Sequence, residues 1–280
     1  MSRKSTPGPT IHRDLGPLAR ATAFRRGLLR WLRRHGRDLP WRRTRDPYRI
    51  VVSEFMLQQT QVSRVEGYFD RFLKQYPTVE ALAAASPLAV RESWEGLGYY
   101  RRAVNLHRLA QAVVGEHGGV VPSDPMVLRG LPGVGRYTAG AVASFAYERP
   151  TPAVDTNVAR VLRRAFHPRL GPKARQRRLW ETAERLLPRR GPTAWTFNQA
   201  IMELGALVCT ARVAHCQACP VRRACATGRS AKGEVIVLGS GKPAAVLEEG
   251  EQAVPCPDRV GEKVRHELRG EDSGARRQLE

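Results

Sequence analysis

Apolar residues recur mostly at intervals of three and four between residues 21 and 225, as in AFRRGLLRWLRR and AVNLHRLAQAVVGEH. This spacing places them along one face of an α-helix, and runs with the alternation of a β-strand are scarce. Proline and glycine interrupt the pattern at short intervals, as in RDLPW, HGGVVPSDP and RRGP. Since these residues end helices rather than continue them, the pattern predicts an all-α fold of short helices.

The composition changes after Cys225. Residues 226–280 are rich in glycine, proline and charge, and their one apolar run is EVIVLG. We expect residues 227–280 to be mostly disordered, with at most a small hairpin near residues 234–247, because so little apolar material cannot stabilise a domain. Cys256 falls in this tail and is given no role.

Nothing in the sequence predicts a membrane or secretory protein. No window approaches about 18 consecutive apolar residues. The N-terminal segment 1–20, which is predicted to be flexible and basic, lacks the apolar core of a signal peptide. We therefore expect an intracellular, cytoplasmic protein without a membrane partner, associated with the nucleoid if its source is bacterial.

The chain is strongly basic, with 47 Lys and Arg against 26 Asp and Glu and a formal net charge of +21. Residues 226–280 hold nine Lys or Arg and ten Asp or Glu, so their net charge is −1 and residues 1–225 carry +22. A positive surface of this size attracts polyanions through counterion release. Nucleic acid is the favoured partner, and an anionic membrane surface is the alternative.

Four of the five cysteines lie together in CTARVAHCQACPVRRAC, residues 209–225. The spacing is Cys-x6-Cys-x2-Cys-x5-Cys, with one close pair and two unequal arms. Zinc sites usually use two similar Cys-x2-Cys pairs, whereas a [4Fe–4S] cluster accepts four thiolates at irregular spacings. We therefore predict one [4Fe–4S] cluster, with zinc, or unligated or disulfide-bonded cysteines, as alternatives. The predicted ligands are Cys209, Cys216, Cys219 and Cys225.

A second motif, LPGVGRYTAGAVASFAY, occupies residues 131–147. Gly133 and Gly135 flank Val134, and an apolar helical run follows. Glycines at such a turn allow backbone N–H groups to converge at a helix N-terminus, where a phosphate is favoured. The motif predicts a helix-hairpin-helix at about residues 125–147 that binds DNA phosphates. An ordinary turn between two helices is the alternative.

Two carboxylates stand at unusual positions. Glu54 lies in the mostly apolar helical run RIVVSEFMLQQTQV, where burial of a carboxylate is costly unless it is paired or protonated. A partly protonated acid in an apolar pocket suits general acid catalysis, and a buried ion pair with an arginine is the alternative. Asp155 lies in TPAVDTNVARVLRR, where a Pro-containing connection gives way to a helix. It suits the role of helix cap, which Thr156 or Asn157 could share.

Taken in order, these motifs resemble the endonuclease III superfamily of DNA glycosylases over about residues 22–226. The segments that carry the resemblance are LPWR, DPYRIVVSEFMLQQTQV, WEGLGYYRRAVNLH, LPGVGRYTAGAVAS, VDTNVARV, FNQAIMELGALVC and the cysteine spacing. Within the superfamily, MLQQTQV and GLGYY are similar to the branch that removes adenine mispaired with guanine or 8-oxoguanine. The resemblance implies a base-excision-repair enzyme, acting as a monomer on double-stranded DNA that holds an A:8-oxoguanine or A:G mispair.

The resemblance also implies two helical domains with the active site in the cleft between them. A six-helix domain is expected at residues 49–149. An iron–sulfur cluster domain is expected to combine residues 21–48 with residues 150–226.

The roles of the superfamily's residues carry over to matching positions. Glu54 matches the acid that protonates the adenine ring and then activates water, and Asp155 matches the carboxylate that stabilises the cationic sugar. Asn157 and Tyr137 match residues that support this site, and the four cysteines match the cluster ligands. The residues expected near DNA enter the base stack, lie beside the pocket or form the hairpin: Gln59, Tyr99, Leu57, Gln58, Arg42, Gly133, Val134, Gly135 and Arg136.

Three departures from the superfamily pattern modify these expectations. Relatives that cut the DNA strand have a lysine after the hairpin to form a Schiff base, whereas this chain has Tyr137 there and only Lys74 and Lys173 in its helical region. We therefore predict little strand cleavage. Thr156 stands where many relatives have glycine, and we expect activity to survive. Residues 226–280 are too few and too polar to form the Nudix-like domain typical of the adenine branch, so we expect weaker discrimination between 8-oxoguanine and guanine than in full-length relatives.

Two other functions stay open. The first is a thymine or uracil mismatch glycosylase of the same superfamily, although thymine can leave as a stabilised anion without an acid such as Glu54. The second is a non-catalytic iron–sulfur DNA-binding protein. The presence of both Glu54 and Asp155 argues against the second.

Overall fold

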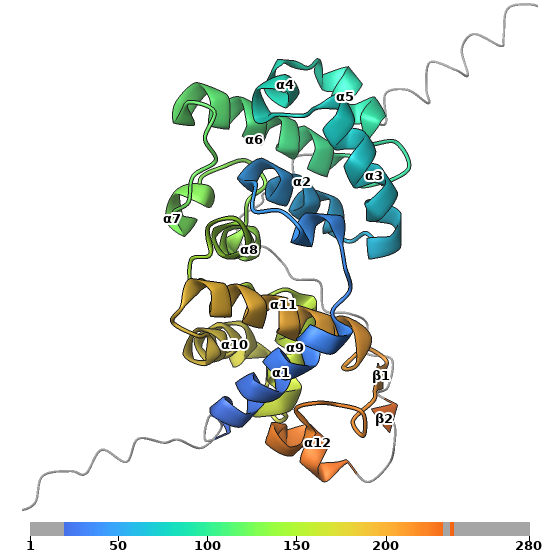
Figure 1. The fold of residues 1–280 in the computed structure, drawn as a ribbon, viewed down its shortest axis with the longest axis vertical. Helices are drawn as coiled ribbons and strands as arrows, with labels where there is room; N and C mark the ends of the chain where they lie inside the picture. Colours follow the sequence, from blue (N-terminus) through green and yellow to red (C-terminus); the bar gives the residue numbers. More distant parts are fainter. Residues whose placement is uncertain (1–19, 232–235, 238–280) are drawn as a thin grey trace, which may run out of the picture. The chain divides into compact units, whose positions relative to one another are not determined.

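The computed structural model describes residues 20–231 and 236–237, and the chain there is almost entirely helical (Figure 1). This confirms the predicted all-α class. None of the described helices is long and apolar enough to cross a membrane. The helical elements in chain order are α1 (Ala21–His35), η1 (Pro40–Arg42), α2 (Pro47–Leu57), α3 (Val62–Gln75), α4 (Val79–Ala84), α5 (Pro87–Ser93), α6 (Arg101–His117), α7 (Pro125–Leu128), α8 (Arg136–Tyr147), α9 (Thr156–Phe166), α10 (Pro172–Leu186), α11 (Gly191–Leu207), η2 (Arg222–Ala224) and α12 (Ala226–Ser230).

Short sequence signals set several of the helix ends. Pro47 begins α2, and Asp46 caps it by accepting a hydrogen bond from the Arg49 N–H group. At the other end of a longer helix, α6 stops at Gly118, whose φ of 59° lies in the left-handed region. Glycine adopts this conformation without strain, so the turn there follows directly from the residue type.

Most of the buried apolar side chains form two cores. Helices α2 to α8, with η1, build the first core, and Trp94 is fully buried in it. Helices α1, α9, α10 and α11, with η2, build the second core around Phe24, Leu162 and Leu186. In the first core α4 packs on α6 and α2 packs on α8, whereas in the second α11 packs on both α1 and α9.

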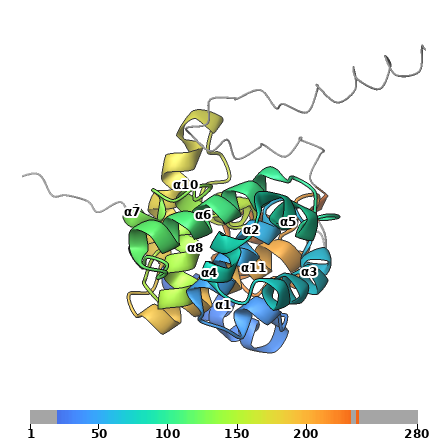
Figure 2. The ribbon, with the colours of Figure 1, turned by 90° about the horizontal axis from the view of Figure 1, so that it is seen from above.

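The chain passes between the two cores at two places. It crosses from the second core to the first between Leu28 and Leu39, and it returns between Ala153 and Val154, which are neighbours in sequence but belong to different cores. Helices α8 and α11 contact each other across this junction, as Figures 1 and 2 show, and Met202 of α11 packs against both cores. The residue after Val154 therefore lies where the two cores meet.

One short β-ladder is present among the described residues. Val213–Ala214 (β1) pairs antiparallel with Ile236–Val237 (β2), so part of the EVIVLG run pairs with the cysteine segment. The remainder of the predicted hairpin near residues 234–247, the rest of the tail beyond residue 237 with Cys256, and residues 1–19 lie outside the described residues. The predicted domain limits after residues 48 and 149 stay predictions.

Candidate active site

Glu54 is a buried carboxylate in the apolar part of α2. This helix is buried from Ile50 to Met56, and only 5% of Glu54 is exposed. Burial raises the pKa of Glu54 to about 7, because the carboxylate loses its hydration; a hydrogen bond from Tyr137 opposes this shift, and the charge of Asp155 adds to it. A group with such a pKa can hold and release a proton near neutral pH.

Tyr137 meets Glu54 because α8 packs on α2. It is the second residue of α8, and its hydroxyl donates a hydrogen bond to the Glu54 carboxyl group. Burial, with the nearby charges of Glu54 and Asp155, raises the pKa of Tyr137 well above its ordinary value, so the hydroxyl stays protonated. The Oε2 atom of Glu54 is buried and has no hydrogen-bond partner among the described residues. The Glu54 carboxyl group thus has Tyr137 as a hydrogen-bond partner, and its Oε2 atom has none in the part of the chain that the structure describes.

Asp155 caps α9 and also belongs to this group of charges. Its Oδ1 atom accepts from the Val158 N–H group at 2.6 Å, and its Oδ2 atom accepts from Asn157 Nδ2 at 2.8 Å. Burial raises the pKa of Asp155, although these hydrogen bonds and the charge of Arg160 oppose the shift. The capping interpretation is confirmed, and the charge of Asp155 also acts on Glu54. The catalytic role of Asp155 stays a prediction.

Arg160 connects this group to the cysteine segment. Its Nη2 atom donates to Asn157 Oδ1 at 2.6 Å and to the Gly205 carbonyl at 2.7 Å, while Nε donates to the Cys209 carbonyl at 2.8 Å. A Cβ atom on Gly205 would lie 2.7 Å from the Cβ of Asn157, so the close approach of α11 requires glycine. Arg160 was not among the site residues predicted from the sequence. Arg160 lies three residues after Asn157 on α9, and this spacing could have indicated that the two side chains are neighbours.

The four predicted cysteine ligands are free thiols that lie near one another. Burial raises the pKa of Cys219 to about 12, and the charges of the other three cysteines add to the shift, so thiolates here need a positive partner. Hydrogen-bond donors face several of the sulfur atoms. Arg164 Nη1 lies 3.2 Å from Cys209 Sγ, and the Gly228 N–H group donates to Cys225 Sγ at 3.2 Å.

The cysteine set suits a metal–sulfur group by its chemistry. Soft thiolates with hydrogen-bond donors to sulfur are what such groups use. As the side chains stand, however, no group of three His, Cys, Asp or Glu residues in the described ranges is arranged to hold a metal ion. A cavity of about 560 Å³ lies beside Cys219, and its lining includes Arg222, Arg223 and Arg229. The predicted [4Fe–4S] cluster stays a prediction.

The glycine turn joins α7 to α8, which pack against each other. Gly133 has a φ of 73°, and a Cβ atom there would lie 2.8 Å from the Cβ of Asn105. Val134 is buried in the first core and anchors the turn. Gly135 precedes α8, and no side chain of the described residues caps that helix. The first N–H groups of α8 therefore suit an anion, as the hairpin prediction requires.

Two arginines predicted to contact DNA have partners within the protein. The Arg136 guanidinium lies 3.9 Å from the centre of the Trp180 ring and donates to Glu184 at 3.0 Å, both on α10. The Arg42 Nη2 atom donates to Glu203 at 2.8 Å. Their contact with DNA stays a prediction.

Glu203 on α11 is a buried carboxylate that was not among the residues predicted from the sequence. The Arg37 guanidinium donates to both of its carboxylate oxygens, at 2.8 and 3.0 Å, the Arg37 backbone N–H group donates to it at 3.0 Å, and Arg42 adds a fourth hydrogen bond. Burial alone would raise the pKa of Glu203, but the hydrogen bonds from Arg37 and Arg42 outweigh it and lower the pKa to about 2. An acid in the apolar run IMELGAL was the available signal, of the same kind that identified Glu54.

The two side chains predicted to enter the base stack lie at exposed turns. Gln59 follows the end of α2, and Tyr99 precedes α6 with 62% of its surface exposed. Both residues adopt left-handed backbone conformations, with φ values of 55° and 49°. Leu57 and Gln58, predicted beside the pocket, are half-buried at the end of α2.

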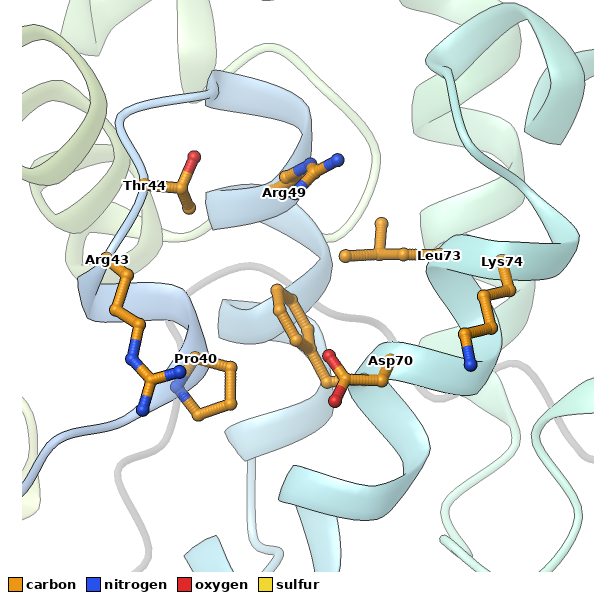
Figure 3. A pocket seen from close by; sticks show the side chains of 8 residues that line it. Pro40, Arg43, Thr44, Arg49, Asp70, Leu73 and Lys74 are labelled. Carbon is orange, nitrogen blue, oxygen red and sulfur yellow. The ribbon is translucent and has the colours of Figure 1, made fainter.

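The hollow in Figure 3 is a different feature. It has a volume of about 420 Å³ and is lined from η1, α2 and α3, with Arg43, Asp70 and Lys74 among its side chains. Arg43 is already engaged, since it donates to both oxygens of Asp38 at 2.8 and 2.6 Å. None of the predicted site residues lines this hollow.

Comparison with known proteins defines the class. Residues 52–185 match the model described as HhH-GPD superfamily base excision DNA repair protein. The thymine-DNA glycosylase of Aeropyrum pernix is 38% identical over 214 residues, which cover 74% of this chain and 94% of that protein. A solved structure of a thermostable thymine-DNA glycosylase has a TM-score of 0.70 at 31% identity, covering 76% of this chain and 98% of that one. The chain belongs to the HhH-GPD superfamily, which confirms the predicted resemblance.

Within this superfamily the chain is also similar to adenine DNA glycosylases. That of Mycolicibacterium smegmatis is 50% identical over 195 residues, covering 69% of this chain and 66% of that protein. The chain thus spans just under two thirds of the length of this relative. Relatives named for adenine and for thymine both match this chain, so the similarity alone does not identify the base that it removes.

Proposed function

We propose that this protein is an adenine DNA glycosylase of base excision repair. It hydrolyses the N-glycosidic bond of adenine mispaired with 8-oxoguanine or guanine in double-stranded DNA. The observation that carries the proposal is the buried carboxyl group of Glu54, with a pKa of about 7 and an unpaired Oε2 atom among the described residues. Adenine is a poor leaving group as an anion, so its departure needs the proton that such an acid supplies.

In the first step Glu54 donates its proton to a ring nitrogen of adenine. The glycosidic bond then breaks, its electron pair goes to the base, and adenine leaves as a neutral molecule. The hydrogen bond from Tyr137 would hold the Glu54 carboxyl group in place, and the Oε2 atom, which has no partner among the described residues, would donate the proton to the base. The buried surroundings of Glu54 favour this proton transfer, because bulk water does not compete with adenine for the proton.

In the second step the sugar carries positive charge as an oxocarbenium-like species. Asp155 stabilises that charge, since two hydrogen bonds hold its carboxylate in place and oppose its protonation. Glu54, now ionised, takes a proton from a water molecule, and the oxygen of that water attacks the anomeric carbon of the sugar. The product is an abasic site, and the protonated acid is restored.

The adenine must leave the duplex before Glu54 can reach it. Extrusion of a base leaves a gap in the stack that inserted side chains can fill. Gln59 and Tyr99 suit this role because both are exposed at adjacent ends of α2 and α6. The hairpin N–H groups at α8 and the net charge of +22 on residues 1–225 favour the phosphate backbone.

The enzyme is proposed to release the base without cutting the strand. Strand cleavage by this chemistry uses an amine that forms a Schiff base with the sugar. The residue beside Glu54 is Tyr137, whose protonated hydroxyl cannot do so. The site groups come from a single chain, so the enzyme is proposed to act as a monomer.

The cysteines at 209, 216, 219 and 225 are proposed to bind one [4Fe–4S] cluster. When bound, it would supply a rigid centre for the loop rather than chemistry at the base. Arg164 and the Gly228 N–H group would then donate to its sulfur ligands. The arginines at 222, 223 and 229 would present positive charge beside it.

Single-turnover base release tests the proposed function. Duplexes with A:8-oxoguanine, A:G, A:C, T:G or U:G pairs are incubated with the protein, with and without subsequent alkali. Adenine release that needs alkali for strand scission is expected. Glu54→Gln should retain binding and lose release, and thymine or uracil release that survives Glu54→Gln would contradict the adenine proposal.

A thymine mismatch glycosylase is the second candidate. The match to this chain covers 94% and 98% of the length of two proteins named thymine-DNA glycosylase. The T:G duplex separates the two directly. Binding to every duplex without release of any base would instead favour a non-catalytic DNA-binding protein.

A further inference from the structure

Arg102 is a buried arginine that the proposed mechanism does not use. It lies in the first turn of α6 and is 7% exposed. A positive charge is unfavourable there, because the N-terminal end of a helix carries positive partial charge. The helix itself therefore does not explain this residue, and its partners must lie elsewhere.

The guanidinium of Arg102 holds two separate turns together. Nη1 donates to three carbonyl groups at the end of α2, and Nη2 donates to two carbonyl groups in the turn before α6. Four of these hydrogen bonds measure 2.8 to 3.2 Å. The carbonyl groups belong to Phe55, Met56, Gln58, Leu97 and Gly98. The carbonyls at the end of α2 have no partner within their own helix, so a cation suits them.

Each turn continues directly into an exposed residue with unfavourable backbone geometry. Gln59 follows Gln58 and has a φ of 55°, and Tyr99 follows Gly98 and has a φ of 49°. Residues other than glycine adopt such angles only when their surroundings impose them. In the described residues, Glu148 is the third non-glycine residue of this kind, and it ends α8. The guanidinium of Arg102 is thus bound to both of these strained turns, and we call it the Arg102 clamp.

We propose that Arg102 is the positioning residue for Gln59 and Tyr99. One guanidinium fixes both turns, so the two side chains are presented together and at a set separation to the DNA base stack. The proposal rests on the proposed function, in which these side chains fill the gap left by the extruded adenine. Arginine is required because its planar fork can serve two directions at once, whereas the point charge of lysine cannot.

The test compares Arg102→Lys with Arg108→Lys, a matched change at an exposed position of the same helix. All variants also carry Glu54→Gln, so that no base is released. The readout is the fluorescence of 2-aminopurine placed beside the target adenine, which reports insertion of side chains into the stack. Arg102→Lys should reduce the fluorescence change on saturating binding, and Arg108→Lys should leave it unchanged.

A double-mutant cycle separates positioning from general stability. With Glu54 intact, Arg102→Lys should slow single-turnover release by about threefold to a hundredfold. In a protein that also carries Gln59→Ala and Tyr99→Ala, the same change should cost less than about twofold, since it has nothing left to position. An equal loss in both backgrounds would mean that Arg102 only stabilises the fold, and would overturn the proposal.

Gly98→Ala gives a second route if Arg102→Lys does not fold. A Cβ atom added at Gly98 would meet open space, but the φ of 72° at this position is unfavourable for alanine, so the turn is disturbed without a clash. The same loss of fluorescence change is expected.

The two proposals fail in different ways. If the protein with Glu54 intact releases no base, while the fluorescence change in the Glu54→Gln background still depends on Arg102, the proposed function is overturned and the positioning role stands. No difference between Arg102→Lys, Gly98→Ala and the parent would overturn the positioning role, whatever base is released.

Discussion

The side chain of Arg160 holds the amide of Asn157 through a 2.6 Å hydrogen bond from Nη2 to Oδ1. This contact fixes which way the amide faces, because the oxygen is taken by Arg160 and the nitrogen must point to Asp155, 2.8 Å away. Arg160 also donates to the Cys209 carbonyl, so the residue that orients the Asn157 amide towards Asp155 is itself held to the cysteine segment.

The first prediction concerns Asn157→Ala. Its hydrogen bond lowers the pKa of Asp155, so removing it should raise that pKa. Asp155 would then become protonated at a higher pH, and the acidic limb of the pH–rate profile should move upward. We expect about a tenfold loss of single-turnover rate near neutral pH and a larger loss below it. Thr156→Ala is the control, since Thr156 is exposed on the same turn, and an unchanged acidic limb in Asn157→Ala would contradict the assignment.

The second prediction concerns the basic limb of the same profile. Because protonated Glu54 is the acid, base release should fall as pH rises through about 7. The Tyr137 hydrogen bond lowers the pKa of Glu54, so Tyr137→Phe should raise this pKa and move the basic limb to higher pH. Glu54→Gln should remove the limb and slow release by about a hundredfold to ten-thousandfold. A basic limb that does not move in Tyr137→Phe would show that another group titrates.

The third prediction concerns stability. Glu203 is fully buried and paired with Arg37 and Arg42, so Glu203→Gln should lower the free energy of unfolding by about 3 kcal/mol at pH 7. The carboxylate has a pKa of about 2 in the folded protein against an ordinary value of 4.5. Its contribution is therefore complete above pH 4.5 and is lost as pH falls towards 2, so the two proteins should converge in acid.

Denaturant unfolding at several pH values measures this difference. Glu184→Gln is the control, because Glu184 forms an exposed pair with Arg136 and should cost less than about 1 kcal/mol. A gap between wild type and Glu203→Gln that stays constant down to pH 2 would exclude the ion pair as its source.

The fourth prediction contrasts two glycines. Gly133→Ala should destabilise the protein by about 1–2 kcal/mol and weaken binding to undamaged duplex DNA, because the φ of 73° and the 2.8 Å approach to Asn105 both disfavour a side chain. Gly67→Ala, on an open face of α3, should instead stabilise the protein by about 0.5–1 kcal/mol. Thermal unfolding and DNA affinity at one salt concentration check both. DNA binding that is unaffected in Gly133→Ala would argue against the hairpin as a phosphate site.

Much of the site was visible in short sequence segments. The acid in the apolar run around Glu54, the capping position of Asp155 and the glycine turn at Gly133 are local patterns, and the structure describes each where it was expected. Glu203 shows how limited such a pattern is. It is also an acid in an apolar run, yet its pKa is about 2 while that of Glu54 is about 7. Two arginines distant in sequence make the difference.

The sequence by itself determined the helices, their caps and breaks, the grouping of the cysteines and the superfamily, because all of these depend on residues a few positions apart. Only the tertiary structure decided which groups meet: Tyr137 with Glu54 through the packing of α8 on α2, and Arg160 with Cys209 across 49 residues. The physical reason is that burial and hydrogen bonding set the charge state of an acid, and both are properties of the packed chain. The Arg102 clamp is of the same kind, since its carbonyl partners at the end of α2 are about 45 residues away and carry no side-chain signal.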